Sequence, residues 1–106
     1  MATGRLGVAD LSAATNTTLY TVPASTFSVV TVSVVNRGST AANIRIAIAA
    51  SATPADSEFI EFDTSLSAKG VLERTGLVMD AGKLLVVRSS ATTVNAVAYG
   101  IETSTA

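Results

Sequence analysis

Residues 20–50, YTVPASTFSVVTVSVVNRGSTAANIRIAIAA, decide the fold of this chain, because two runs of β-branched residues flank one short polar segment. In the first run, residues 27–35, seven of nine residues are β-branched or aromatic, a composition enriched in strands. Successive side chains of a strand point to opposite sides. Val30, Val32 and Val34 share one side of this run and the other side is mixed, which predicts a strand covered on both sides.

The second run, residues 43–49, alternates isoleucine with polar or small residues, as expected of a half-buried strand. Residues 36–40 (NRGST) predict a turn, because Asn and Gly tolerate positive φ. We therefore expect an antiparallel hairpin whose Val and Ile sides build the core. The opposite side of that hairpin is the predicted subunit-contact face, made of Thr31, Ser33, Asn43, Arg45 and Ala47.

The rest of the chain reads as further short strands separated by turn residues, a spacing typical of sandwiches and barrels. We predict one all-β domain over residues 1–106, an antiparallel β-sandwich of seven to eight short strands, jelly-roll or immunoglobulin-like. Residues 1–12 are either a short first strand or an extended N-terminal arm. Gly76 predicts a bulge inside a strand over residues 71–79. The polar tail, residues 102–106, is expected to fray.

The composition excludes several kinds of chemistry. The chain has no Cys and no His, which removes disulfides, thiolate metal sites and the usual Ser-His-Asp triad. We predict no enzymatic activity, no cofactor and no metal site. The densest acidic group is Glu58, Glu61 and Asp63, of which Glu61 and Asp63 share a side if the strand is regular. A solvated edge that discourages stray strand pairing is the interpretation we favour for it over a Ca²⁺ site.

Charge and hydropathy indicate which partners to expect. Seven basic residues against eight acidic ones, scattered along the chain, are not the footprint of a nucleic-acid-binding protein. Apolar stretches are broken well before the ~18 residues of a membrane span. Charged residues make up 14% and hydrophobic residues 48% of the chain, and mean hydropathy is +0.48. A surface this poor in charge tends to associate, which favours a subunit of a homo-oligomer.

Four short motifs carry a family resemblance. LYTVP (residues 19–23), VNRG (35–38), ERTG (73–76) and MDAGK (79–83) lie in segments that together span most of the chain. These segments resemble small virion structural proteins of tailed phages, notably phages of marine cyanobacteria. The resemblance implies a non-enzymatic, β-rich particle component and carries over no catalytic residue.

This resemblance directs the functional expectation. A head decoration (cement) protein, located in the virion after assembly in the host cytoplasm, is the first expectation. Its expected partners are other copies of itself, with a trimer favoured by three-fold capsid sites, and the phage major capsid protein. The alternatives are a tail, neck or fibre component, and a carbohydrate-binding attachment module. A carbohydrate module needs surface aromatics, for which Tyr20 and Tyr99 are plausible, although the aromatic residues as a group are expected in the core.

Overall fold

A computed structural model describes residues 2–105 as a β-sandwich. The predicted all-β sandwich fold is confirmed, with eight strands and one short 3-10 helix, η1 (Asp56–Glu58). Sheet A has the order β1-β8-β3-β6 and sheet B the order β2-β7-β4-β5. The strands are β1 Thr3–Asp10, β2 Thr17–Thr21, β3 Thr26–Asn36, β4 Ala42–Ala49, β5 Phe59–Leu66, β6 Val71–Met79, β7 Leu84–Ser89 and β8 Val94–Ser104.

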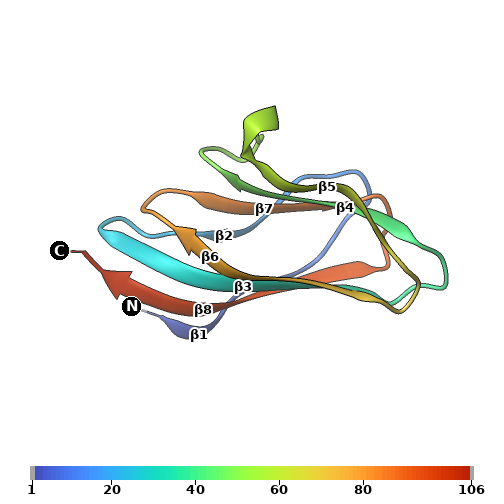
Figure 1. Cartoon of the computed structure of the whole chain (residues 1–106), viewed down its shortest axis with the longest axis horizontal. Coiled ribbons are helices and arrows are strands. Elements are labelled where there is room, and N and C mark those ends of the chain that lie inside the picture. Colours follow the sequence, from blue (N-terminus) through green and yellow to red (C-terminus); the bar gives the residue numbers. More distant parts are fainter. Residues whose placement is uncertain (1, 106) are drawn as a thin grey trace.

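The strand order is that of a jelly roll. Antiparallel ladders join β1 to β8, β2 to β7, β3 to β6 and β4 to β5, so the chain is in effect one long hairpin rolled into two sheets (Figure 1). An immunoglobulin sandwich instead places its first two strands side by side in one sheet. Here β1 and β2 belong to different sheets.

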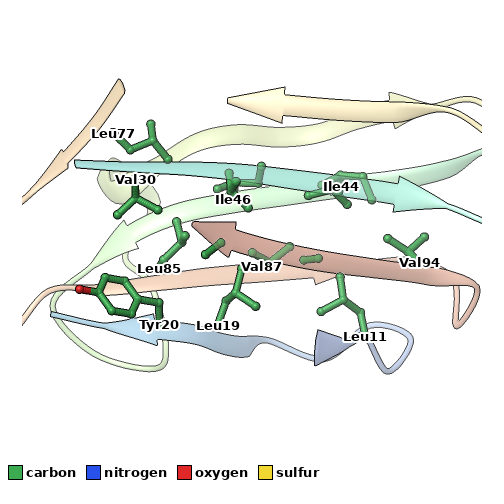
Figure 2. Packing of buried hydrophobic residues seen from close by; sticks show 14 of the residues in the cluster. Leu11, Leu19, Tyr20, Val30, Ile44, Ile46, Leu77, Leu85, Val87 and Val94 are labelled. Carbon is green, nitrogen blue, oxygen red and sulfur yellow. The ribbon is translucent and has the colours of Figure 1, made fainter. Parts of the chain in front are cut away.

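The core lies between the sheets and is built by the alternation seen in the sequence. Val30, Val32 and Val34 of β3 and Ile44 and Ile46 of β4 are fully buried, as predicted. Ile48 is half-buried and packs against this core. Figure 2 shows side chains of both sheets meeting in the interior, with leucines and valines of β2 and β7 completing the packing.

The predicted hairpin between the two runs is wrong. β3 pairs with β6 and β8, whereas β4 pairs with β5 and β7, so residues 37–41 cross from one sheet to the other. Hydrophobic alternation specifies which side of a strand is buried. The same alternation fits two strands paired in one sheet and two strands that face each other from different sheets, so it does not predict pairing. Neither Asn36 nor Gly38 adopts a positive φ in this connection.

The predicted bulge at Gly76 is confirmed. Val30 pairs with Leu77 and Val32 with Arg74, so Thr75 and Gly76 together stand opposite one residue of β3. Gly76 has a φ of +67°, which glycine adopts at little cost.

The described residues near both ends of the chain form strands, which at the N-terminal side is one of the two alternatives that the sequence left open. The N-terminal segment is a strand rather than an arm, since β1 pairs antiparallel with β8 from Thr3 to Asp10. The expectation that the tail frays from residue 102 is wrong, because β8 continues to Ser104 and Glu102 is 8% exposed. A buried hydrogen-bond partner, Tyr20, retains Glu102 in the sandwich.

Candidate functional site

The five residues of the predicted subunit-contact face do not share one surface. Thr31 and Ser33 lie half-buried on the outward side of β3, in sheet A, while Asn43, Arg45 and Ala47 lie on the outward side of β4, in sheet B. They are separated because β3 and β4 belong to opposite sheets. The role of each group in subunit contact stays a prediction, now for two different faces.

Ala47 is buried by the protein itself. It forms a small second cluster with Ala49 and Val86, against which Phe59 and Leu84 pack. Glu58, at the end of η1, fastens the adjacent loop by accepting hydrogen bonds from the backbone amides of Ala50 (2.9 Å) and Ala55 (2.8 Å). These two bonds lower the pKa of Glu58. Part of the outer face of sheet B is therefore closed to a partner.

The outer face of sheet A is apolar and open. Among residues 2–105, eight large hydrophobic side chains are exposed, and seven of them lie on sheet A strands and point away from the core. We call these seven the sheet A patch. It consists of Val8, Phe27, Val29, Val71, Val78, Tyr99 and Ile101.

Strand register places the central members of this patch side by side. Val29 stands opposite Val78 on one side and Ile101 on the other, forming an apolar row across three strands. Tyr99 follows in the next row, opposite Thr31, and its hydroxyl donates to Glu73 at 3.1 Å. The signal was present in the sequence, where the second side of β3 is mixed rather than polar. The expectation that the aromatic residues belong to the core therefore fails for Phe27, Phe62 and Tyr99, whereas it holds for Tyr20.

The outer face of sheet B carries a polar depression of about 250 Å³. Arg45 of β4 and Arg88 of β7 stand directly opposite each other in the ladder and both line it. Asn43 of β4 also lines it, and the remaining lining residues come from three further segments: Ala14, Asp63 and Ser90.

Arg45 is held in place on two sides. Its Nε donates to Asp63 Oδ1 at 2.7 Å and its Nη2 to Asp63 Oδ2 at 3.1 Å, a two-pronged pair. The guanidinium also lies 4.1 Å from the centre of the Phe62 ring, and Phe62 meets Phe59 edge to face at 5.1 Å. The Arg45 hydrogen bond lowers the pKa of Asp63, and the same bond raises the pKa of Arg45.

The acidic group of β5 is not arranged as expected. Asp63, at a φ of +52°, sits in a bulge opposite Arg45, so Glu61 and Asp63 point to opposite sides of sheet B. Glu61 faces inward, where it accepts hydrogen bonds from Arg74 of β6 and from the Thr64 hydroxyl (2.6 Å). The prediction that Glu61 and Asp63 share a side is thus wrong. Within residues 2–105, no group of three or more acidic, His or Cys side chains is placed to hold a metal.

Comparison with known proteins gave no relative. No family model matches the chain, and no curated protein or solved structure matches it significantly. In the segment that the structure covers, no helix is both long and apolar enough to cross a membrane.

Proposed function

We propose that this chain is a non-enzymatic structural subunit of a phage virion. The favoured role is a capsid decoration protein, a homotrimer that stabilises the head by binding between major capsid proteins. The sheet A patch is the observation that carries the proposal, together with the phage-like segments of the sequence. Seven exposed large hydrophobic side chains lie on this one face, and gathered exposed apolar side chains mark contact surfaces.

The dimensions of the sandwich suit this role. The described residues span 46 × 27 × 19 Å, so a broad sheet face offers an area on the order of 1,000 Å², against ~800 Å² per partner in a stable interface. Polar and charged groups border the patch: Arg37 pairs with Asp10 at 3.6 Å and donates to Asn95 at 3.0 Å, and Arg5 stands opposite Tyr99. An apolar centre with a polar rim is the usual anatomy of an interface.

The jelly roll supports the proposal by analogy alone. It occurs in viral capsid domains and also in lectin domains, so fold by itself does not select a function. Of the two aromatic residues considered for carbohydrate binding, Tyr20 is buried and only Tyr99 is exposed. A tail, neck or fibre position would use the same apolar face and differs from the favoured role only in location.

The location of the protein tests the proposal. Particles from a lysed culture that carries the gene are banded on a density gradient, probed with an antibody to this chain, and imaged by cryo-microscopy. We expect the protein to band with the particles and its density to lie at three-fold positions of the head. Density on the tail would favour the alternative role, and recovery of all the protein in the soluble fraction would overturn the proposal.

The contact face is tested by paired variants. Val78→Lys with Ile101→Lys places two charges in the sheet A patch, and Thr18→Lys with Thr21→Lys adds the same charges on exposed positions of β2 in sheet B. We expect the first pair to convert the oligomer into monomers in analytical ultracentrifugation while the second pair leaves it intact. If both double variants have the same oligomeric state, the sheet A patch is not the contact face.

A further inference from the structure

The polar depression of sheet B contains an uncompensated positive charge. Arg45 and Arg88 are cross-strand neighbours, and like charges directly opposite each other destabilise a sheet. Asp63 neutralises Arg45 through both of its carboxylate oxygens. Arg88 makes no hydrogen bond or ion pair with any residue in the range 2–105, which leaves one net positive charge in the hollow.

Further hydrogen-bond donors converge on the same hollow. The Ser90 oxygen accepts a bond from the Asn43 backbone amide at 2.9 Å, so its hydroxyl proton is available to donate. The Asn43 side-chain amide is exposed and has no partner within the described chain. Arg88 contributes a planar fork of N–H groups that matches a carboxylate at two points. The Arg88 guanidinium, the Asn43 side-chain amide and the Ser90 hydroxyl therefore each have an N–H or O–H group that can donate to a ligand.

Charge and size together define the ligand. A single net positive charge matches a monoanion, whereas the ionised Asp63 repels the second charge of a dianion such as phosphate. A volume of about 250 Å³ is below the ~300–1,000 Å³ usual for sites of free small molecules and has room for a side chain.

We infer that this depression binds a carboxylate, in the form that an aspartate or glutamate side chain of a neighbouring subunit presents. The carboxylate bridges the Arg88 guanidinium and the Asn43 and Ser90 donors, and Arg45 is kept beside it by Asp63 and Phe62. The origin of the carboxylate in a neighbouring subunit rests on the proposed function, while the affinity for a carboxylate does not.

Sodium acetate is the probe for the site itself. The full chain, labelled with ¹⁵N, is titrated with sodium acetate at constant ionic strength, with sodium chloride as the replaced salt. We expect saturable shifts of the Arg88 Nε–H and the Asn43 side-chain amide, and weaker binding of inorganic phosphate. No saturable shift on the unaltered chain, or an equal response to chloride, would overturn the inference.

Two matched variants assign the binding. Arg88→Gln should weaken acetate binding by about tenfold or more, because it removes a charged donor pair. Arg5→Gln loses the same charge from the exposed outer side of sheet A and should leave acetate binding unchanged. Equal affinities of the two variants would exclude the hollow as the site.

A side-chain mimic and particle assays separate this inference from the proposed function. N-acetyl-glutamate amide should bind at least as well as acetate if the hollow receives a side chain, and weaker binding would contradict that source. If the protein binds acetate but is absent from particles, the virion role is wrong and the carboxylate site stands. If the protein is found in particles but does not bind acetate, the carboxylate site is wrong and the virion role stands.

Discussion

The phenol of Tyr20 on β2 donates a 2.6 Å hydrogen bond to the carboxylate of Glu102 on β8, and so joins the two sheets across the core. The Ser28 hydroxyl lies 2.6 Å from the same phenol oxygen, and the backbone amide of Ala2 donates to the other Glu102 oxygen at 2.9 Å. Figure 2 shows the Tyr20 ring at one end of the apolar cluster. Within residues 2–105, no buried side-chain polar atom lacks a partner, so this bridge adds specificity without an orphaned group.

Acid should weaken the protein through Glu102. The Tyr20 hydrogen bond, followed by that of Ala2, lowers the pKa of Glu102 below its ordinary value of 4.5. Its contribution to stability is therefore fully present above about pH 4.5 and is lost as pH falls through the lower, folded-state pKa. Urea unfolding at a series of pH values should show that Glu102→Gln loses stability less steeply than the unaltered chain below that pH. An identical slope in the two proteins would contradict this role of Glu102.

Alkali should act through the other partner of the bridge. Burial, and then the hydrogen bond to Glu102, raise the pKa of Tyr20 to about 12 from 10.0. The folded state holds this proton more tightly, so the contribution to stability is complete below pH 10 and is lost as pH rises toward 12. In Tyr99→Phe, where Tyr20 is the remaining tyrosine, phenolate absorbance should appear near pH 12 when folded and near pH 10 in denaturant. Coincident titration curves would show that the phenol is not held by the core.

Asn36 should be worth more to stability than its place beside a turn indicates. Its side-chain amide donates to the Thr40 carbonyl at 2.8 Å and lies 3.3 Å from the carbonyls of Leu66 and Ser67. Its oxygen accepts from the Gly38 amide and the Thr93 hydroxyl, so that one fully buried residue ties three connections together.

Asn36→Ala removes all of these contacts at once, including the buried contact with the Leu66 carbonyl, whereas the Ser67 carbonyl keeps the Gly70 amide. We expect a loss of about 2–3 kcal/mol in the free energy of unfolding, from the ~1–3 kcal/mol cost of unsatisfied buried groups. Asn43→Ala, at an exposed residue of β4, is the control, and its free energy of unfolding should stay within about 0.5 kcal/mol of the unaltered chain. Equal losses in the two variants would mean that the Asn36 bonds contribute little.

These residues also show how far sequence reasoning reaches. The alternation at Val30–Val32–Val34 and Ile44–Ile46 was enough to predict strands and the core side, because burial of one side has a period of two. It did not predict strand partners, since β3 and β4 face each other across the core and are not paired. Pairing depends on how the whole chain is rolled up, which a local pattern does not contain.

The polar sites were harder to foresee for a related reason. Tyr20 and Glu102 are separated by 82 positions in the chain, and nothing near either residue signals the other. The hollow of sheet B is assembled from the connection before β2, from β4, β5 and β7, and from the segment after β7. Arg45 was singled out from the sequence, whereas Arg88 was not, because their opposition is a result of the β4–β7 register.

The open edge of the sandwich should depend on a second inter-sheet contact. Arg74 of β6 donates to the Glu61 carboxylate and to the Ile60 carbonyl (3.0 Å) of β5, so the contact joins the edge strands of the two sheets. The side chains of Arg74 and Glu61 are 35% and 18% exposed, so solvent screens the pair only in part.

A double-mutant cycle with Arg74→Met and Glu61→Gln measures this contact. We expect a coupling of about 1–2 kcal/mol in urea unfolding, above the ~0–1 kcal/mol of a fully exposed pair. The Lys83–Asp80 pair (3.1 Å), whose side chains are 36% and 76% exposed, serves as the control cycle, and its coupling should be the smaller of the two because solvent screens it more. Similar couplings in both cycles would place the Arg74–Glu61 contact among ordinary surface pairs.

The core prediction is tested by two isoleucines on the same side of β4. Ile46 is fully buried between the sheets, whereas Ile48, two residues along, is half-buried at the margin of the cluster. Ile46→Ala should cost ~2–5 kcal/mol of unfolding free energy, because it removes buried methyl groups and leaves a cavity that a stiff sandwich does not refill. Ile48→Ala removes the same atoms but should cost less, since water already reaches part of that side chain. A loss below roughly 1 kcal/mol for Ile46→Ala, or an equal loss for both variants, would show that the centre of the sandwich is loosely packed.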